Sequence, residues 1–179
     1  MAFAAKTKYD SVAISLHWVV AALLVFMLFF GEELMEAEEG SSTLAPSLHV
    51  SIGSAILVFT VFRLVWRLVN PPPAYPASLA LWEQMAAKAM HLLFYVLLIC
   101  IPLTGWLAMP KFLSEEGAMT GITFFGAFPL PGAPNLGFPM KGIHELGTNT
   151  GIALLALHVI AALKHHFINR DDVLRRMLP

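Results

Sequence analysis

Four long apolar segments, separated by polar or proline-rich stretches, dominate the pattern of residues along the chain. They run roughly over residues 11–30, 48–69, 89–109 and 144–167. A helix needs about 20 mostly apolar residues to cross the hydrocarbon core of a bilayer, and each segment is long enough. The pattern therefore predicts an all-α membrane protein, a bundle of four transmembrane helices that forms a single domain over residues 1–179.

The connections between the segments are also readable. Asn70 and the three prolines after it end the second segment, because proline lacks the N–H that a continuing helix needs. Pro110 is expected to end the third segment in the same way. Residues 78–88 predict a short amphipathic helix at the membrane surface. Residues 111–142 are rich in Gly, Pro and Phe and predict a long loop, which in a compact protein is usually functional or packed as a cap.

Composition agrees with a membrane protein and excludes several other classes. Hydrophobic residues make up 58% of the chain and charged residues 13%, against about 45–50% and about 25% in soluble domains. The net charge of −1 argues against a nucleic-acid partner, which would need a clustered basic face. Cys100 is the sole cysteine, which excludes an intramolecular disulfide and a thiolate metal cluster.

The positive charges beside the segments predict the orientation. Lys111 and Lys141 flank one side of the predicted bundle, and the other side carries Lys6, Lys8, Arg63, Arg67, Lys88, Lys164, Arg170, Arg175 and Arg176. Because the cytoplasmic side collects Lys and Arg, both termini are expected in the cytoplasm. The first loop is then external and acidic, with Glu32, Glu33, Glu36, Glu38 and Glu39. The first segment is interpreted as retained, since no small-residue cleavage site follows it.

Seven histidines in so apolar a chain need an explanation, because an ionisable residue inside a membrane span is a functional-site hypothesis by default. In the predicted orientation His17 and His158 lie towards the cytoplasm, and His49 and His144 lie towards the outside. His158 follows His144 by 14 residues, so it lies about 21 Å deeper on nearly the same helical face. The four histidines therefore fall into two layers.

Two layers of paired histidines are what two b-type haems require, since each haem takes two axial ligands from facing helices. We pair His49 with His144 on the outer side and His17 with His158 on the inner side. A zinc or copper site is the alternative, but a closed zinc site needs three or four ligands at one depth. A histidine in a membrane helix is also often an interhelical hydrogen-bonding group.

Neighbouring residues would complete such a site. Gly147 and Gly151 share the face of His144, and Gly53 lies one turn below His49, so a flat macrocycle would meet backbone there. The alternative for Gly147 and Gly151 is plain helix packing. Arg63 and Arg67 lie one turn apart at the inner end of the second segment. They would either pair with haem propionates or anchor the helix as part of the positive cytoplasmic flank.

Four motifs together resemble the bacterial cytochrome b561 family, closest to its superoxide oxidase members, over nearly the whole chain. The motifs are Ser15-Leu16-His17-Trp18; residues 48–53 with residues 63–67; His91-Leu92-Leu93-Phe94-Tyr95 running to Pro102-Leu103-Thr104-Gly105-Trp106; and Ile143-His144-Glu145 leading to Leu157-His158 and residues 164–167. Each motif is weak alone and specific in combination.

The resemblance implies a four-helix di-haem protein of the bacterial inner membrane. Such proteins pass electrons between superoxide at the periplasmic face and ubiquinone near the cytoplasmic face. Carried over by position, the ligands of the two haem b groups would be His17, His49, His144 and His158. His91 and His165 would line a quinone pocket. His91 also lies in the inner layer. The alternative that His91 is the ligand in place of His17 therefore stays open.

The predicted function is a superoxide:ubiquinone oxidoreductase acting alone. The many acidic residues of the external loops would repel superoxide, so another periplasmic donor or redox partner stays open. The alternative function is a cytochrome b membrane-anchor subunit that relays electrons for a larger oxidoreductase complex. Such a subunit would dock through the Phe-rich loop (Phe112, Phe124, Phe125, Phe128 and Phe138), although these rings would also suit the membrane interface. A haem-free transporter is disfavoured, since no Asp or Glu falls mid-span.

Overall fold

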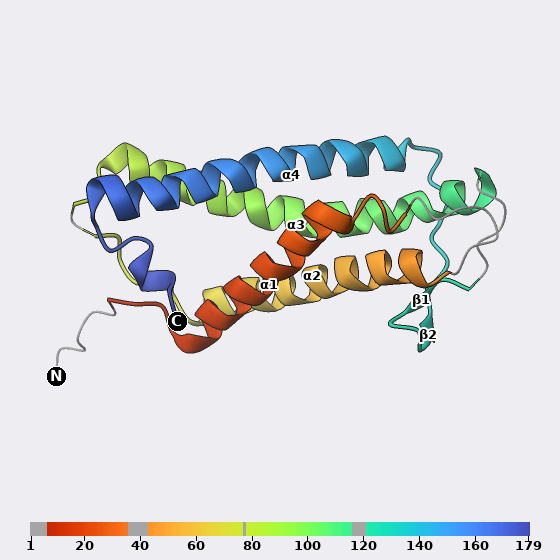
Figure 1. Ribbon diagram of the computed structural model, residues 1–179, viewed down its shortest axis with the longest axis horizontal. Helices are drawn as coiled ribbons and strands as arrows, with labels where there is room; N and C mark the ends of the chain where they lie inside the picture. The colour runs from red at the N-terminus through yellow and green to blue at the C-terminus, as the bar shows by residue number, and fades with distance from the viewer. Residues whose placement is uncertain (1–6, 36–42, 77, 116–120) are drawn as a thin grey trace.

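The computed structural model describes residues 7–35, 43–76, 78–115 and 121–179. Four long helices dominate it (Figure 1): α1 (Ser11–Phe30), α2 (Leu44–Val69), α3 (Leu81–Glu115) and α4 (Met140–Leu163). All four contain a stretch long and apolar enough to cross a membrane. The predicted all-α membrane bundle is therefore confirmed.

Two predicted boundaries are wrong, and both concern α3. The separate amphipathic helix expected over residues 78–88 does not exist, because α3 begins at Leu81 and no Gly or Pro interrupts the chain before Pro102. Pro110 does not end this helix either, since α3 continues to Glu115. A proline removes a single backbone hydrogen bond, and helices in membrane proteins tolerate that loss when their neighbours support them.

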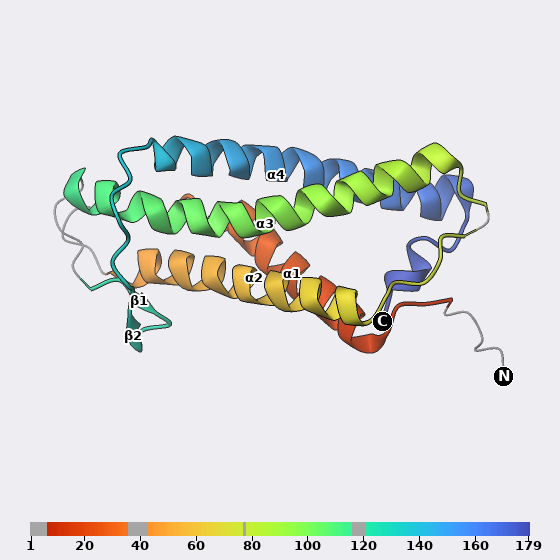
Figure 2. The ribbon, with the colours of Figure 1, turned by 180° about the vertical axis from the view of Figure 1, so that it is seen from behind.

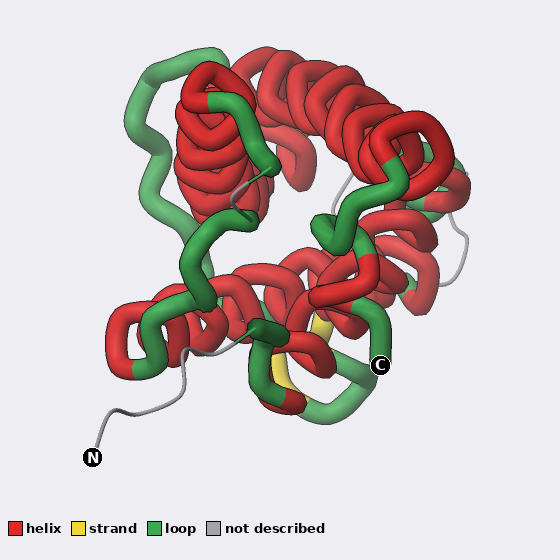
Figure 3. Tube along the Cα trace, turned by 90° about the vertical axis from the view of Figure 1, so that its left-hand side faces the viewer, coloured by secondary structure: helices red, strands yellow, loops and turns green. Residues whose placement is uncertain are grey.

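The helices form an antiparallel bundle in which sequence neighbours pack together. The closely packed pairs are α1 with α2, α2 with α3, and α3 with α4, and α1 is not packed closely against α4 in the described part of the chain. Figure 2 shows α3 and α4 side by side, and Figure 3 views the bundle along its long axis. The tightest apolar cluster joins three of them through Val20, Ile56 and Leu98.

The two ends of the bundle differ. The first described residues, from Thr7, and the C-terminus lie at one end of the bundle, which we call the terminal end (Figure 1). There α4 continues into a π-helix, Lys164–Asn169, and a short 3-10 turn, Arg175–Met177, follows. The indole N–H of Trp18 donates to the carbonyl oxygen of Met177 at 2.8 Å, which joins this turn to α1. The side of the membrane on which this end lies stays a prediction.

The opposite end carries a small β-hairpin that the sequence did not predict, and we call it the hairpin end. Strand β1 (Thr123–Phe124) pairs antiparallel with β2 (Phe128–Pro129). The turn between them contains Phe125 and Gly126, both with positive φ (48° and 73°). Of the charged and aromatic residues discussed above, Lys6, Glu36, Glu38 and Glu39 lie outside the described residues, as do the side chains of Lys111 and Phe112.

Candidate functional site

At the hairpin end, His49 from α2 and His144 from α4 face each other. Their ring centroids lie 6.3 Å apart and the ring planes are inclined by 56°. Both side chains are half-buried. The two imidazoles predicted to share the outer layer are thus brought together across the bundle.

Both of these rings are held by backbone carbonyl groups. His49 Nδ1 lies 2.8 Å from the carbonyl oxygen of Gly31, and His144 Nδ1 lies 2.8 Å from that of Ile101. Gly31 ends α1, where carbonyl groups lack a partner within the helix. Because a carbonyl oxygen only accepts, each Nδ1 carries the proton and each Nε2 keeps its lone pair. This is the usual support of a histidine that binds a metal through Nε2.

Gly105 is a site residue whose role sequence reasoning missed. A Cβ added to it would lie 2.9 Å from His144 Cε1 and 3.0 Å from Nδ1, so α3 needs a glycine where the ring lies. The residue stands in one of the motifs above, one turn after Ile101, which provides the carbonyl. A glycine inside an apolar helix often marks close approach by a neighbour, and that signal was present in the sequence.

The other glycines divide into two groups. A Cβ on Gly147 would lie 3.0 Å from Ile101 Cγ1, and one on Gly151 would lie 3.6 Å from Ile101 Cδ1. These two residues therefore pack α4 against α3, and the expectation that they adjoin a macrocycle is wrong because that face is already covered by α3. A Cβ on Gly53 would have no heavy atom within 4 Å, so the backbone of α2 is open at that point.

Nearer the terminal end, His158 lies between histidines of two other helices. The ring of His158 in α4 lies 6.3 Å from that of His17 in α1 and 6.5 Å from that of His91 in α3, measured between centroids. Phe94 packs edge-on against His158 at 5.4 Å. The predicted pair of His17 and His158 is therefore brought together, and the alternative partner His91 is nearly as close to His158.

Two ring nitrogens in the cluster of His17, His91 and His158, which we call the inner cluster, have no hydrogen-bond partner among the described residues. They are the buried Nδ1 atoms of His17 and His91. An unpaired buried nitrogen costs about 1–3 kcal/mol and calls for a specific reason. Arg63 is close enough to act electrostatically on all three histidines. The cluster thus combines unpaired imidazole nitrogens with a neighbouring positive charge.

The pair separations fit axial ligation of iron. Two imidazoles on opposite sides of one metal ion have ring centroids about 6.3 Å apart, since a metal–nitrogen bond is about 2.0–2.1 Å and each ring centre lies about 1.1 Å behind its nitrogen. The pair of His49 with His144 and the pair of His17 with His158 both match this value. In the described residues no three His, Cys, Asp or Glu side chains converge on one point as a closed zinc site requires.

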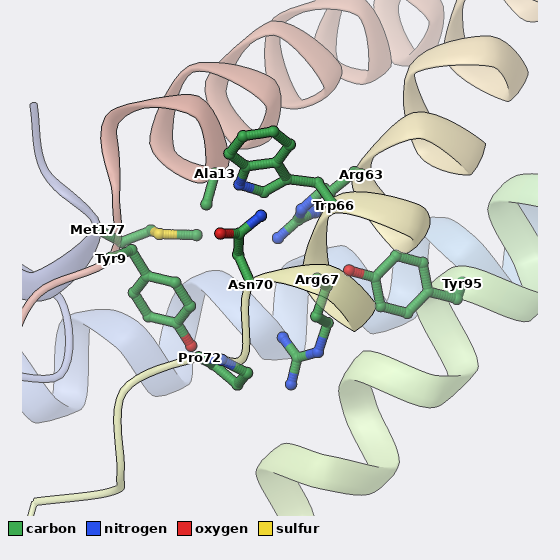
Figure 4. A pocket seen from close by; sticks show the side chains of 9 residues that line it. All are labelled: Tyr9, Ala13, Arg63, Trp66, Arg67, Asn70, Pro72, Tyr95 and Met177. Atoms are coloured by element: carbon green, nitrogen blue, oxygen red, sulfur yellow. The ribbon is translucent and has the colours of Figure 1, made fainter. Parts of the chain in front are cut away.

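A small pocket opens at the terminal end of the bundle (Figure 4). It is lined by Tyr9, Ala13, Arg63, Trp66, Arg67, Asn70, Pro72, Tyr95 and Met177. The guanidinium carbon of Arg63 lies 5.8 Å from the centre of the Tyr95 ring, a cation–π distance that holds this arginine. Two guanidinium groups in one pocket are suited to an anionic group such as a carboxylate.

His165 lies in a setting that the sequence did not predict. It is buried in the π-helix, and its Nδ1 donates to Asp171 Oδ2 at 2.6 Å. Burial alone would raise the pKa of the Asp171 carboxyl, but hydrogen bonds from the Val173 N–H and from His165 lower that pKa below its ordinary value. His91 and His165 were expected to line one quinone pocket, yet within the described residues no hydrogen bond or ring contact joins them.

Comparison with known proteins agrees with this arrangement. Residues 8–179 match the family described as prokaryotic cytochrome b561. The chain is 32% identical to "Cytochrome b561 homolog 2" of Escherichia coli (strain K12), with 96% of this chain and 91% of that protein aligned. It is 30% identical to "Probable superoxide oxidase CybB" of Yersinia pestis, with 96% of each chain aligned. It is also 28% identical to "Cytochrome b562" of Cereibacter sphaeroides, with 95% and 94% aligned.

Proposed function

Because the chain belongs to the prokaryotic cytochrome b561 family, whose members are haem b proteins of membrane electron transfer, we propose that it holds two haem b groups, one towards each end of the bundle. The observation that carries this proposal is the pair of His49 and His144. Their rings are 6.3 Å apart, and each Nδ1 is fixed by a backbone carbonyl. Bound haem would supply reversible one-electron chemistry, and the protein would supply ligands, burial and charge.

For the second haem we propose His17 and His158 as ligands. His91 lies at nearly the same distance from His158, so ring separation alone does not choose between His17 and His91. Helix packing supports His17, because α3 packs closely against α4 and α1 does not. A macrocycle needs a slot between the helices that carry its two ligands. The family resemblance supports His17 as well.

Arg63 and Arg67 are the residues that we propose for the propionates of this second haem. Both line the terminal-end pocket, and Arg63 acts electrostatically on His17 and His158. A guanidinium group binds a carboxylate through two parallel hydrogen bonds. If only membrane anchoring were needed, an arginine exposed at the helix end would serve, whereas Arg63 lies over Tyr95.

We propose that electrons enter at the hairpin end and leave to ubiquinone at the terminal end, with the termini in the cytoplasm of the bacterium and the bundle in its inner membrane. With superoxide as donor, each of two superoxide ions would give up one electron and leave as O₂. The two electrons and two protons would convert ubiquinone to ubiquinol. A relative named as a probable superoxide oxidase supports this donor. Glu32, Glu33 and Glu145 would oppose an anion, which supports a periplasmic redox partner as the alternative donor.

A second candidate function is a membrane-anchor subunit of a larger oxidoreductase complex. The exposed Phe125, Phe128 and Phe138 of the loop after α3 favour it, because docking surfaces are rich in aromatic residues. Copurification of a stoichiometric partner from the native membrane would distinguish this function from a protein that acts alone.

The proposal is tested by measuring haem per chain in the purified protein. A reduced-minus-oxidised spectrum and a haem-to-protein ratio of two are expected. A colourless preparation, or a ratio of one after expression with excess haem, would contradict the two-haem proposal. Superoxide-dependent reduction of a soluble ubiquinone analogue then tests the donor and the acceptor, with heat-inactivated protein as control.

A further inference from the structure

The β1–β2 hairpin is fastened to α2 by two serine side chains. Ser47 Oγ accepts the N–H of Thr123 at 3.0 Å, and Ser51 Oγ accepts the N–H of Phe125 at 2.7 Å. Ser51 Oγ in turn donates to the carbonyl oxygen of Ser47 at 2.6 Å. Both serines are buried, with 3% and 0% of their surface exposed. The first two turns of a membrane-spanning helix thus provide hydrogen-bond acceptors to a loop.

The length of α2 indicates the depth of this attachment. Its 26 residues span about 39 Å at about 1.5 Å per residue, whereas a hydrocarbon core is about 30 Å thick. If the helix is centred in the bilayer, Ser47 lies at the edge of the core and Ser51 about 6–7 Å inside it. Figure 1 shows the hairpin beside these turns of α2, on the side away from α3 and α4. The N–H of Phe125 donates to Ser51, so the turn of the hairpin lies at the depth of Ser51, about 6–7 Å inside the edge of the core.

The chemistry of the hairpin suits that level. Residues 121–139 contain no Asp, Glu, Lys or Arg. The exposed surface of the hairpin is aromatic, with Phe125 66% and Phe128 70% exposed. Four of its backbone donors are satisfied within the protein: Thr123 and Phe125 donate to the serines, and Ala127 and Leu130 donate to the carbonyl groups of Phe124 and Ile122 at 2.9 and 3.1 Å. Backbone at membrane depth must satisfy its polar groups inside the protein, and aromatic side chains concentrate at the lipid interface.

We propose that this hairpin inserts into the boundary between lipid headgroups and acyl chains, with Ser47 and Ser51 as the receptor for its backbone. The partner is the bilayer, because the hairpin lies beside a helix long and apolar enough to span it, carries no charged residue and exposes two aromatic side chains. His49 lies between the two serines in sequence, on the opposite face of the same turns. The hairpin therefore holds the part of α2 that carries His49. The inference does not depend on haem.

The test places a fluorophore on the hairpin of the full chain in phosphatidylcholine vesicles. Cys100, the sole cysteine, is first replaced in C100A, and F128C then carries an NBD label. The matched control is N135C in the same background, because Asn135 is an exposed polar residue of the same loop. We expect the label at residue 128 to emit at shorter wavelength, to be quenched by shallow doxyl lipids and to be several-fold less accessible to aqueous iodide. Equal iodide quenching at both sites, or an emission shift that needs an added soluble protein, would overturn the inference.

The serine receptor is tested by a matched pair of variants. S51A removes the acceptor of the Phe125 N–H, whereas S54A removes a hydroxyl that hydrogen-bonds to Val50 O within its own helix. We expect S51A to raise iodide quenching of the label at residue 128 several-fold and S54A to leave it unchanged. The same response in both variants would contradict the role of Ser51. The depth measurement with both serines intact decides the insertion even if S51A fails to fold.

Discussion

The imidazole of His144 lies directly against the backbone of Gly105. A Cβ at residue 105 would come within 2.9 Å of His144 Cε1, while His144 Nδ1 lies 2.8 Å from the Ile101 carbonyl oxygen. Glycine at this position therefore lets α3 approach closely enough to provide that hydrogen bond. The position of an imidazole at the hairpin end depends on a residue that has no side chain.

Replacing this glycine should disturb the haem that we propose at the hairpin end. G105A places a methyl group where the ring lies, and such overpacking costs about 1–3 kcal/mol. We expect the His144–Ile101 hydrogen bond to be lost and one of two haems to change its low-spin EPR signal or to be lost. The control is G151A, where the added Cβ would make an ordinary contact with Ile101 at 3.6 Å. Unchanged spectra in G105A would show that the ring is not positioned in this way.

Substitution of the paired histidines should remove the haems one at a time. H49A and H144A are expected to lose the same haem, and H17A and H158A the other, because in our proposal each pair shares one iron. The haem-to-protein ratio should fall from two to one in each variant and to zero in the H49A/H158A double variant. H91A separates the two candidate partners of His158. If H91A loses a haem and H17A keeps both, His91 is the ligand.

The two haems are expected to differ in reduction potential. At the hairpin end the Nδ1 groups of His49 and His144 both donate to carbonyl oxygens, which would make the proposed ligands more basic and favour oxidised iron. At the terminal end the nearby positive charge of Arg63 favours reduced iron. Electrons would then pass spontaneously from the hairpin end to the terminal end.

Potentiometric titration of single-haem variants tests this order. The haem that remains in H17A should have a lower reduction potential than the haem that remains in H49A. The expected difference is about 59 mV or more, which corresponds to a tenfold equilibrium constant for the transfer of one electron. Combined with H49A, R63Q should lower the reduction potential of the remaining haem. Combined with H17A, it should leave the potential of the remaining haem unchanged, so that haem serves as the control. The reverse order of potentials would contradict the proposed effect of the Nδ1 hydrogen bonds and of Arg63 on the two potentials. It would not contradict the presence of two haems.

Much of this arrangement follows from the sequence because it depends on geometry within single helices. The spacing of His144 and His158 determines their separation and angle along α4 without knowledge of the other helices. The length of the apolar segments likewise predicts four spans, and α1 begins and ends at the predicted residues. Local rules are sufficient for such features.

The remaining features depend on how neighbouring helices are rotated and docked. Gly147 was placed on the correct face of α4, but only the packing of α3 shows that Ile101 covers it. The attachment of Thr123 to Ser47 joins residues far apart in the chain and could not be predicted from local patterns. His165 lies in a π-helix, a rare form that periodicity does not predict.

The carboxylate of Asp171 should stabilise the segment after α4 in a pH-dependent way. Although burial opposes ionisation, hydrogen bonds from the Val173 N–H and from His165 lower the pKa of this group in the folded protein. A carboxyl of this kind stabilises the fold above its unfolded pKa of about 3.9, and this stabilisation is lost as the pH falls through the lower folded pKa. D171N should therefore lower the melting temperature at neutral pH, and the difference from the wild type should shrink below about pH 4.

The neighbouring residue provides the control for this measurement. The Asp172 side chain is 70% exposed and lies 3.6 Å from Arg175, so D172N removes a carboxylate with a weak surface ion pair. Thermal unfolding in detergent, followed by intrinsic fluorescence at several pH values, should show a loss for D171N and almost none for D172N. Equal melting temperatures for the two variants, or a D171N deficit that grows on acidification, would show that the His165–Asp171 contact does not hold this end of the bundle. Because the contact spans the π-helix, its loss should also raise amide exchange over residues 164–169, which localises the effect independently of the melting temperature.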